Sequence, residues 1–445
     1  MIKNKFNRLS SKEWLLFQKS WTIWESDEKL YADNICFFTK PEEEKKSVVA
    51  FWGQEESYSL AQVVAQHHDC WITKECSSQV QFAIADCRFI RTLEEYVAHK
   101  SALKAWLENL FELLEHRRFV CILISNVFSG VQYFPAAWDL ALSVSAHFSL
   151  KDEKIICFHS DNLPDTCYAL YFRKDEESAQ KGISEELLFQ PSILFPFPST
   201  PHWFILKPAP RKKNEILHPA KYPEELVMKF VESFTQKEDI VFDPMSGTGS
   251  TQVGAIRLRR NAYGTELNEF FAKIANERIQ AEIKNASFQA KVLVKDARKI
   301  QSVDFPMAHY MLTSPPYWDM LNMKGAENQQ KRKQKGLPLN YSDAAEDLGN
   351  ISEYEKFLTE LVAIYKNLLP MLQPMARFTV VVKNIKKKGK NYPFAWDLAK
   401  LLSPYFHLQP EMFWLQDDLS IAPYGYGNTW VSNTFHQYCL HFVKK

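Results

Sequence analysis

The stretch that decides the fold is I-V-F-D-P-M-S-G-T-G-S-T, at residues 240–251. Its apolar start, Ile240 to Phe242, predicts the end of a buried strand, and the Asp-Pro pair that follows ends that strand. The small residues from Ser246 to Gly249 allow the backbone to approach a ligand closely. Apolar residues then recur at helical spacing and predict a helix over 251–260. A strand, a tight glycine turn and a helix form the nucleotide-binding unit of doubly wound α/β folds.

A second motif, T-S-P-P-Y-W at residues 313–318, follows another apolar run. A glycine turn alone is weak evidence, and this one is not a P-loop because no Gly-Lys-Ser/Thr follows it. Together the two motifs resemble motifs I and IV of the S-adenosylmethionine-dependent DNA amino-methyltransferases, which methylate N4 of cytosine or N6 of adenine. The resemblance implies a Rossmann-like doubly wound methyltransferase sheet and S-adenosylmethionine as the cofactor.

Composition and charge indicate which broad class of protein the chain belongs to. The chain has 445 residues, of which 46% are hydrophobic and 24% charged, and its net charge is +1. That is ordinary for a soluble globular protein of two or three domains, and any DNA-binding surface must be a local patch. No apolar run reaches the ~18–20 residues of a membrane span, and the N-terminus lacks an apolar signal core, so a cytoplasmic protein is expected.

The cysteines also fit a reducing compartment. There are eight, with no C-x-x-C pair, and several lie in apolar runs where a small buried thiol is ordinary. The His67, His68, Cys70 and Cys76 group matches no familiar zinc spacing, so no metal site is expected.

An internal repeat relates the two halves of the chain. Asn384–Leu398 reads N-I-K-K-K-G-K-N-Y-P-F-A-W-D-L, and Asn126–Leu140 reads N-V-F-S-G-V-Q-Y-F-P-A-A-W-D-L, at an offset of 258 residues. Tyr354 matches Tyr96 at the same offset. The closing apolar runs, 438–445 and 167–174, agree as well. The repeat indicates that the first half of the chain is a second copy of the catalytic half of the fold.

That copy lacks the motifs that carry chemistry. At the same offset T-S-P-P-Y would fall on E-E-S-Y-S (55–59), although gaps could move the match, and no Pro-Pro pair or glycine-rich turn precedes the linker. We therefore predict a degenerate methyltransferase-like α/β half-domain (1–184), a proline-rich linker (185–210) and a catalytic methyltransferase domain (211–445). The first domain would serve structure, DNA contact or dimerisation.

The resemblance assigns the cofactor site to several segments. H-P at residues 218–219 opens a segment like motif X, and motif I contributes its turn. The strand predicted at 261–268 ends in Glu266, about twenty residues after the glycines, where Rossmann-like folds place an acid on the ribose hydroxyls. Asp296, after the next strand, would meet the adenine amine; a solvated carboxylate that caps the following helix is the alternative for both acids. The expected cofactor residues are His218, Pro219, Asp243, Pro244, Ser246, Gly247, Thr248, Gly249, Glu266, Asp296 and Thr313.

The expected catalytic residues are Ser314, Pro315, Pro316 and Tyr317. An exocyclic amine is a poor nucleophile because its lone pair is delocalised into the ring. The Ser314 hydroxyl or the Pro315 carbonyl would accept a hydrogen bond from it and direct the lone pair to the methyl carbon. The prolines fix the backbone, and Tyr317 offers a face on which an extruded base stacks. Catalysis would then be mainly positioning.

Three segments are candidates for DNA contact. A basic stretch follows Tyr317, a second lies near residue 387, and an aromatic, glycine-rich loop falls where motif VIII would contribute to the base pocket. The residues concerned are Lys324, Lys331, Arg332, Lys333, Lys335, Lys386, Lys387, Lys388, Tyr424, Tyr426 and, in the same aromatic loop, Asn433. Lysine and arginine at the mouth of the site would neutralise phosphates, whereas a solvated charged loop is the alternative.

The expected function is transfer of a methyl group from S-adenosylmethionine to a flipped base in double-stranded DNA. Serine at position 314 favours N4 of cytosine over N6 of adenine, because that residue is commoner among the cytosine enzymes of the family. An RNA amino-methyltransferase and a non-catalytic DNA-binding subunit of a modification complex stay open as alternatives. A cognate restriction enzyme or a second copy of the chain are the candidate protein partners.

Overall fold

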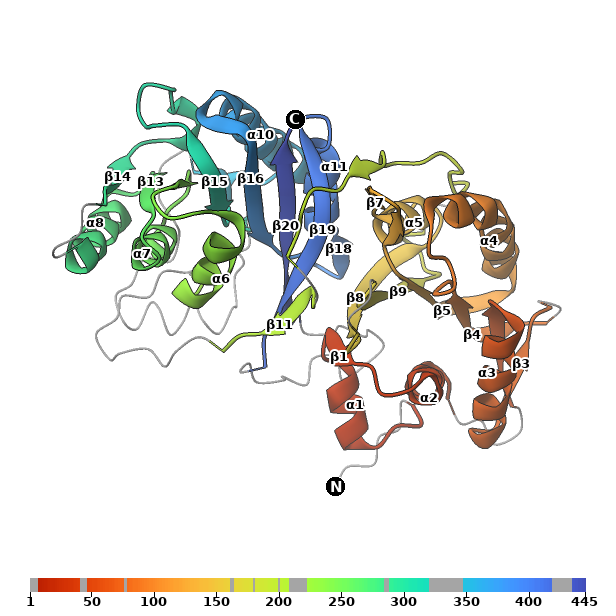
Figure 1. Cartoon of the computed structure of the whole chain (residues 1–445). Helices are drawn as coiled ribbons and strands as arrows, with labels where there is room; N and C mark the ends of the chain where they lie inside the picture. Colours follow the sequence, from red (N-terminus) through yellow and green to blue (C-terminus); the bar gives the residue numbers. More distant parts are fainter. Residues whose placement is uncertain are drawn as a thin grey trace. The chain divides into compact units, whose positions relative to one another are not determined.

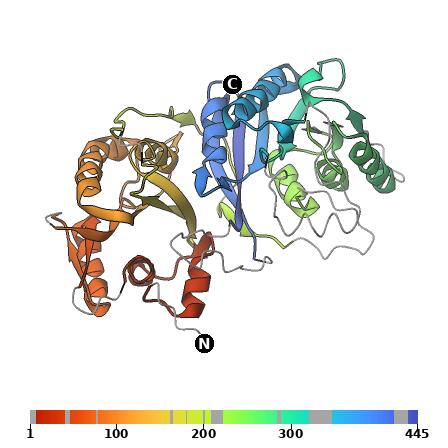
Figure 2. The same cartoon turned by 180° about the vertical axis from the view of Figure 1, so that it is seen from behind.

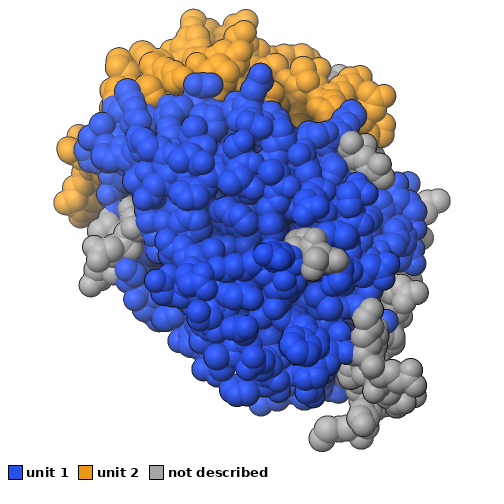
Figure 3. All heavy atoms as spheres, turned by 90° about the vertical axis from the view of Figure 1, so that its right-hand side faces the viewer, with its two compact units in different colours: residues 1–205, 386–392, 415–436 blue, residues 206–385, 393–414, 437–445 orange. Residues whose placement is uncertain are grey.

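The computed structural model describes residues 7–40, 46–75, 78–160, 164–178, 181–198, 201–207, 222–283, 288–319, 347–417 and 434–445. The chain forms two compact units, coloured separately in Figure 3. Unit 1 comprises residues 1–205, 386–392 and 415–436, and unit 2 comprises residues 206–385, 393–414 and 437–445. Each unit is built around its own sheet (Figure 1).

The sheet of unit 2 has eight strands in the order β11-β19-β20-β16-β15-β12-β13-β14. Strands β12 to β16 pair in parallel, and β20 runs antiparallel to β16. Helices α6, α7 and α8 lie on one face, and α10 and α11 on the other (Figures 1 and 2). This is a Rossmann-like doubly wound methyltransferase fold. The bounds are β11 Trp203–Ile205, α6 Glu224–Phe234, β12 Ile240–Asp243, α7 Ser250–Arg257, β13 Asn261–Glu266, α8 Glu269–Ile283, β14 Ala290–Val294, β15 Ala308–Thr313, α10 Tyr354–Asn367, β16 Leu372–Val382, α11 Phe394–Leu402, β19 Phe406–Leu415 and β20 His436–Lys444.

The sheet of unit 1 has seven strands in the order β1-β8-β9-β5-β4-β2-β3. Two small sheets, β10-β7-β6 and the hairpin β17-β18, complete the set. The bounds are α1 Ser11–Phe17, β1 Trp21–Ile23, α2 Asp27–Phe38, β2 Ser47–Trp52, α3 Glu55–His67, β3 Cys70–Thr73, β4 Val80–Asp86, α4 Leu93–Leu113, β5 Leu114–Ile124, β6 Val127–Ser129, β7 Gln132–Phe134, α5 Ala136–Val144, β8 Ser149–Cys157, β9 Thr166–Arg173, β10 Ser192–Ile193, β17 Ile385–Lys387 and β18 Lys390–Tyr392.

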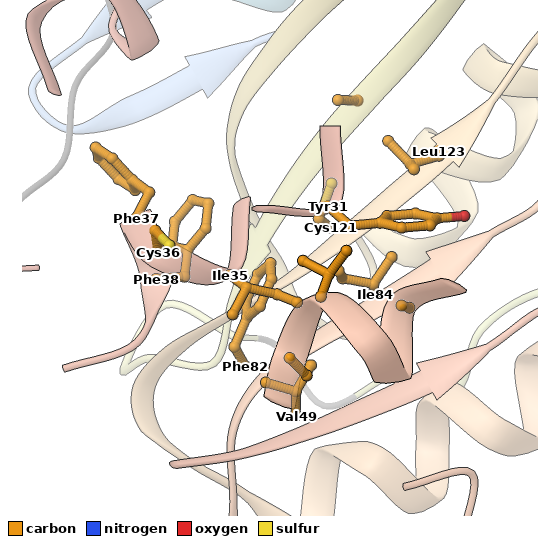
Figure 4. Packing of buried hydrophobic residues seen from close by; sticks show 14 of the residues in the cluster. Tyr31, Ile35, Cys36, Phe37, Phe38, Val49, Phe82, Ile84, Cys121 and Leu123 are labelled. Carbon is orange, nitrogen blue, oxygen red and sulfur yellow. The ribbon is translucent and has the colours of Figure 1, made fainter. Parts of the chain in front are cut away.

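The core of unit 1 forms where α2 covers its sheet. Tyr31 and Ile35 of this helix belong to one buried cluster with Val49 of β2 and with Phe82 and Ile84 of the neighbouring strand β4 (Figure 4). The strands read as apolar runs because helices cover a parallel sheet on both faces, so both sides of each strand are buried.

The repeated segments make the same hydrogen bonds in both units. The Trp138 indole donates to the Tyr168 hydroxyl at 2.9 Å, and Trp396 donates to Tyr438 at 3.1 Å. The Tyr96 hydroxyl donates to the Asp139 carboxylate at 2.6 Å, as does that of Tyr354 to Asp397 at 2.7 Å. Asn126 and Asn384 each accept the backbone N–H at the start of the helix that follows, from Ala137 and Ala395. Most residues that the two repeated segments share therefore make internal hydrogen bonds that hold the common fold together.

Strand register shows how far the two sheets correspond. Phe82 pairs with Phe119 and Val49, and Tyr310 pairs with Arg377 and Val241. Hence β2, β4 and β5 correspond to β12, β15 and β16, and β3 corresponds to β13. Unit 1 therefore also contains counterparts of the strands that flank the glycine turn, which the sequence repeat does not reach because they share only an apolar pattern.

The same register places the counterpart of T-S-P-P-Y at residues 85–89, A-D-C-R-F. The residues at the fixed offset of 258, Glu55–Ser59, instead open α3. The fixed offset therefore fails for this motif. The reason is that the chain between β4 and β5 is much shorter than the chain between β15 and β16.

Unit 1 also takes segments from late in the sequence. The backbone N–H of Phe435 donates to the Ser20 hydroxyl at 2.7 Å, and the Trp21 indole donates to the Gln416 carbonyl at 3.1 Å. Lys386 forms an ion pair with the buried carboxylate of Asp152. These contacts join the start of the chain to residues beyond the catalytic motifs.

Helix and strand ends differ from expectation by a few residues. Apolar residues at helical spacing over 352–372 predict one helix, but α10 ends at Asn367. A 3-10 turn that contains Pro370 follows it, since proline cannot continue the helical hydrogen bonds. The stretch K-V-L-V-K-D-A-R predicts a strand over 291–298, but β14 ends at Val294. In the parts of the chain that the structure describes, no helix combines the length and apolarity needed to cross a membrane.

Candidate functional site

The predicted site residues of unit 2 follow the carboxyl ends of four neighbouring parallel strands, β14, β13, β12 and β15. Ligands of open α/β sheets bind at this edge, where the strand order reverses. Here the reversal lies between β12 and β15, because the chain first moves outward through β13 and β14 and then returns. Motif I and Ser314–Tyr317 are thereby brought to the same edge of the sheet.

Asp243 anchors the turn from below. Its side chain is fully buried and accepts hydrogen bonds from the Tyr222 hydroxyl at 2.9 Å, the Thr251 hydroxyl at 2.7 Å and the Met245 backbone N–H at 3.0 Å. Burial raises the pKa of this carboxyl above its ordinary value. Because its lone pairs are used inside the protein, Asp243 holds the turn. Tyr222 belongs to the motif X-like sequence that begins at His218, but its contact with Asp243 was not predicted from the sequence.

The glycine turn is held in a shape that requires glycine. Gly247 and Gly249 have φ values of 53° and 79°, in the left-handed region. A Cβ on Gly249 would lie 3.0 Å from the Cβ of Ala275 in α8, so the turn and this helix approach closely. The Thr265 hydroxyl donates to the Pro244 carbonyl at 2.7 Å, and the Ser246 backbone N–H donates to the Thr265 carbonyl at 2.9 Å.

Arg278 of α8 closes the outer side of the turn. Its guanidinium donates to the Thr248 carbonyl and forms an ion pair with Glu224 at the start of α6. Ser250 also donates to Glu224, at 3.2 Å. No sequence signal pointed to Arg278, because its partners come from segments far apart in the chain.

Glu266 lies beside the turn at the end of β13. One carboxylate oxygen accepts the Gly247 backbone N–H at 2.8 Å, and the other accepts the Asn268 N–H at 2.9 Å. Desolvation by burial raises its pKa to about 7. Each oxygen keeps a second lone-pair direction, and hydroxyl donors of a ribose would satisfy it. The contact to the glycine turn and the poorly solvated carboxylate fit the nucleoside part of the cofactor.

Asp296 has a different environment from Glu266. It caps the 3-10 turn Ala297–Lys299, accepting the Arg298 backbone N–H at 3.0 Å, and it pairs with the Arg298 guanidinium at 2.9 Å. The cap is the alternative that the sequence left open, and it is present here. A contact from Asp296 to an adenine amine stays a prediction.

Ser314 and Tyr317 are fixed by hydrogen bonds to the sheet. The Ser314 hydroxyl donates to the Val381 carbonyl of β16 at 2.9 Å. The Tyr317 hydroxyl donates to the Gln437 side chain of β20 at 2.8 Å and lies 3.3 Å from the Ser314 oxygen. Burial raises the pKa of Tyr317 to about 12. Because the serine proton is directed to Val381, its lone pairs can accept a hydrogen bond from a substrate N–H.

Lys383 is a site residue that sequence reasoning missed. It follows β16, and its ammonium lies 5.6 Å from the centre of the Tyr317 ring. Burial lowers the pKa of this lysine. This lysine was not predicted as a site residue, because it precedes a run of lysines that look like one solvated loop.

Several predicted residues fall outside the described part of the chain. These are His218, Pro219, Lys324, Lys331, Arg332, Lys333, Lys335, Tyr424, Tyr426 and Asn433. Of the second lysine group, Lys386 is paired with Asp152, Lys387 is half-buried and Lys388 is exposed. The prediction of DNA contact in this group therefore rests mainly on Lys388. No group of three or more residues able to hold a metal ion occurs among the described positions.

Comparison with known proteins shows that part of this chain is similar to DNA methylases. A family model for DNA methylases of the N6 and N4 type matches residues 90–277, a range that includes motif I and ends before Ser314. The type II methyltransferase M.BglII of Bacillus subtilis is 36% identical over 70 residues, which are 16% of this chain and 19% of that enzyme. The orphan methyltransferase M.BamHII of Bacillus amyloliquefaciens is 41% identical over 63 residues, or 14% of this chain and 24% of that enzyme.

These matches are local, since the chain spans only about a fifth to a quarter of those two relatives, 19% and 24%. Among solved structures, TrmN from Thermus thermophilus aligns over 94% of this chain and 77% of its own, with 11% identity and a TM-score of 0.32. That similarity is too low to support a conclusion about function.

Proposed function

Because the chain belongs to the family of S-adenosylmethionine-dependent DNA amino-methyltransferases, we propose that unit 2 methylates the exocyclic amine of a base flipped out of double-stranded DNA. We favour N4 of cytosine over N6 of adenine, because Ser314 opens the S-P-P-Y tetrapeptide. The observation that carries the proposal is the joint presence, at one edge of one sheet, of the motif I turn and a Ser314 whose lone pairs can accept.

The residues of unit 2 fit S-adenosylmethionine. Glu266 would accept the ribose hydroxyls, while the turn from Ser246 to Gly249 would pass close to the ligand because Gly247 and Gly249 carry no side chain. Thr313 ends β15 beside β12, and His218 and Pro219 would complete the site. When bound, the cofactor supplies a sulfonium methyl group as the electrophile.

The target amine would be held by the segment after β15. Ser314 or the Pro315 carbonyl accepts one N–H of the amine, which directs the nitrogen lone pair away from the ring. Tyr317 presents its face to the base, and its ring cannot rotate freely because its hydroxyl is bound to Gln437. Holding nucleophile and electrophile in line converts an encounter into a unimolecular step, which is a large source of rate.

Lys383 adds an electrostatic element to this proposal. A partly desolvated ammonium near the Tyr317 ring disfavours an additional positive charge there. It would therefore favour loss of the proton that the amine must release on methylation. The basic loop of Lys331 to Lys335 and the exposed Lys388 would contact phosphates outside the pocket.

The experiment is single-molecule sequencing of genomic DNA from a strain that expresses the protein. N4-methylcytosine or N6-methyladenine in one sequence motif supports the proposal, and its identity decides between the two bases. Tyr317→Ala should abolish the mark while the purified protein still binds S-adenosylmethionine by calorimetry, because the base pocket and the cofactor site are separate.

The matched control is Trp71→Ala, which removes an exposed aromatic ring of unit 1 far from the motifs in sequence. It should leave the methylation pattern unchanged. An unmodified genome from the wild-type protein, with cofactor binding intact, would contradict DNA methylation by the chain alone. Equal loss of cofactor binding and methylation in Tyr317→Ala would contradict the assignment of the base pocket.

A further inference from the structure

Unit 1 contains a cavity at the carboxyl edge of its sheet. Its volume is about 810 Å³, and its walls come from the segments that follow β1, β2, β4, β5 and β8. The strand order reverses between β2 and β4, as it does between β12 and β15 in unit 2. The cavity thus occupies the position at which doubly wound folds bind ligands, although unit 1 has lost the two motifs.

At the floor of the cavity, a partly buried ion network stands where unit 2 has Ser-Pro-Pro. The Arg88 guanidinium donates to both oxygens of Asp86, at 2.9 and 2.6 Å, and contacts Asp27 at 2.5 Å. Tyr31 donates a hydrogen bond to Asp86 from below. These groups satisfy one another, so the position equivalent to Ser314 cannot hold a substrate amine for methyl transfer.

The turn that would bind the cofactor is shorter in unit 1 than in unit 2. Only three residues (52–54) lie between Phe51 and α3, whereas six (244–249) lie between the equivalent Asp243 and α7. The short turn has one glycine, Gly53, and its φ of 157° is nearly extended, unlike the φ values of 53° and 79° at Gly247 and Gly249. A ligand of this cavity would therefore not be held in the way that unit 2 holds S-adenosylmethionine.

The side walls keep the aromatic character of a base pocket. Phe89 occupies the position of Tyr317 in strand register. On another wall, the rings of Trp24 and Phe158 lie 5.8 Å apart, and the indole of Trp24 is 40% exposed. Planar faces of this kind stack on nucleobases with little dependence on sequence.

The polar groups of the lining suit a neutral ligand. Two carboxylates, Asp27 and Asp86, balance two guanidiniums, Arg88 and Arg91, so the cavity has no net formal charge. Gln54 and Ser57 offer both hydrogen-bond donors and acceptors from the side of α3. Arg91 is exposed and forms no ion pair with any described residue, so it can meet a phosphate at the rim.

We propose that this cavity binds a nucleobase, stacked against Phe89 and the Trp24–Phe158 wall. The base comes either from an unpaired nucleotide of DNA, a source that rests on the proposed function of unit 2, or from a free nucleoside. Unit 1 is then a base-binding module derived from the methyltransferase frame.

The test uses the full chain carrying Tyr317→Ala, which removes the aromatic face of the catalytic pocket. Two fluorescent probes are titrated without cofactor: 2-aminopurine riboside, and a single-stranded oligonucleotide that contains one 2-aminopurine. Saturable quenching of either probe is expected. Adding Phe89→Ala should weaken binding at least about fivefold, the lower end of the range for loss of one stacked base, whereas adding Trp71→Ala should not.

Arg91→Gln distinguishes the two sources. If the base comes from DNA, the oligonucleotide binds more tightly than the riboside, and Arg91→Gln weakens only the oligonucleotide. If the ligand is a free nucleoside, the riboside binds at least as tightly and Arg91→Gln changes neither probe. Either pattern supports a base site.

Ser57→Tyr, which fills the cavity from α3 and retains Phe89, should give the same loss and guards against misfolding of Phe89→Ala. Absence of saturable quenching, or unchanged affinity in both variants, would overturn the proposal. The assay needs no methylation, so a chain that fails to methylate DNA still tests the cavity. If the cavity does not bind a nucleobase, the proposal that the wild-type protein methylates DNA is not affected.

Discussion

The two units share a frame and differ at one edge. The Trp–Tyr, Tyr–Asp and Asn–backbone hydrogen bonds are the same in both. The segment after β15 is S-P-P-Y, however, and the segment after β4 is D-C-R-F. The comparison teaches that the internal polar contacts maintain the fold independently of the chemistry, because they persist where the reactive residues have been replaced.

Within the shared frame, the equivalent aspartates Asp139 and Asp397 have different charged surroundings. Asp139 is fully buried and forms an ion pair with the buried Lys100 at 2.7 Å. Asp397 has the same tyrosine partner, but Leu358 stands where unit 1 has the lysine. Burial accordingly raises the pKa of Asp397 to about 6.

The largest expected effect breaks this pair. Asp139→Asn leaves the Lys100 ammonium buried without its counter-charge, and we expect the free energy of unfolding of unit 1 to fall by about 3–5 kcal/mol. Urea denaturation, with hydrogen exchange of α4 amides to localise the loss, measures it. Asp139→Asn combined with Lys100→Met should recover most of the stability, and a double variant no better than the single one would contradict the explanation.

Asp397→Asn should act in the opposite direction. Because the folded pKa of Asp397 lies above its unfolded value, its contribution to stability is complete below about pH 4 and is lost as the pH rises through about 6. The variant should match the wild type at pH 4 and be more stable at pH 7, as measured by paired urea melts. Equal differences at both pH values would refute the pKa assignment.

A second contrast concerns two left-handed glycines. Gly249→Ala forces a side chain into φ +79° and against Ala275, whereas Gly130→Ala in unit 1 meets a φ of +58° in open space. We expect losses of about 2–3 kcal/mol and about 1 kcal/mol in unfolding free energy. Only the first should also weaken S-adenosylmethionine binding by calorimetry. Equal losses would mean that the close approach to α8 has no cost.

The fourth prediction concerns Glu266, the acid at the end of β13. Glu266→Ala should weaken S-adenosylmethionine binding by about 1–3 kcal/mol, because ribose hydroxyls lose their acceptor. Since burial raises the pKa of Glu266 to about 7, wild-type affinity should increase as the pH rises through that value. Glu266→Gln should remove this rise, and a pH profile parallel to the wild type would refute the role.

The smallest expected effect comes from Gln437, which stands where unit 1 has Cys167. Gln437→Ala removes the acceptor of the Tyr317 hydroxyl and frees the ring, at a cost of about 0.5–1.5 kcal/mol in transition-state stabilisation. The measured quantity is kcat/KM for methyl transfer. Gln437→Glu keeps an acceptor and should lose less than Gln437→Ala does.

The sequence predicted the elements that local patterns specify. The strand Ile240–Asp243, the glycine turn and α7 follow from apolar spacing and glycine content, and the fold class was predicted from the two motifs. The repeat predicted that Tyr96 corresponds to Tyr354 and Trp138 to Trp396, because the repeated residues make the same internal hydrogen bonds in both units. The likeness of β2 and β3 to β12 and β13 was not predicted, since apolar strands can exchange side chains freely while they keep their burial.

Most of the contacts that hold the candidate site in place could not be predicted from the sequence. Tyr222, Arg278, Lys383 and Gln437 act on partners distant along the chain, so no local pattern reveals them. Asp296 differs, because its partner Arg298 is only two residues away and the cap was already an alternative from the sequence. Roles of the individual cofactor and DNA residues stay predictions.

The late segments of unit 1 have a consequence for biosynthesis. Ser20 and Trp21 bind Phe435 and Gln416, which are synthesised 415 and 395 residues later. The first unit therefore cannot complete its native contacts during translation of its own half. Separately expressed halves should therefore lack these contacts when alone and recover them only by fragment complementation.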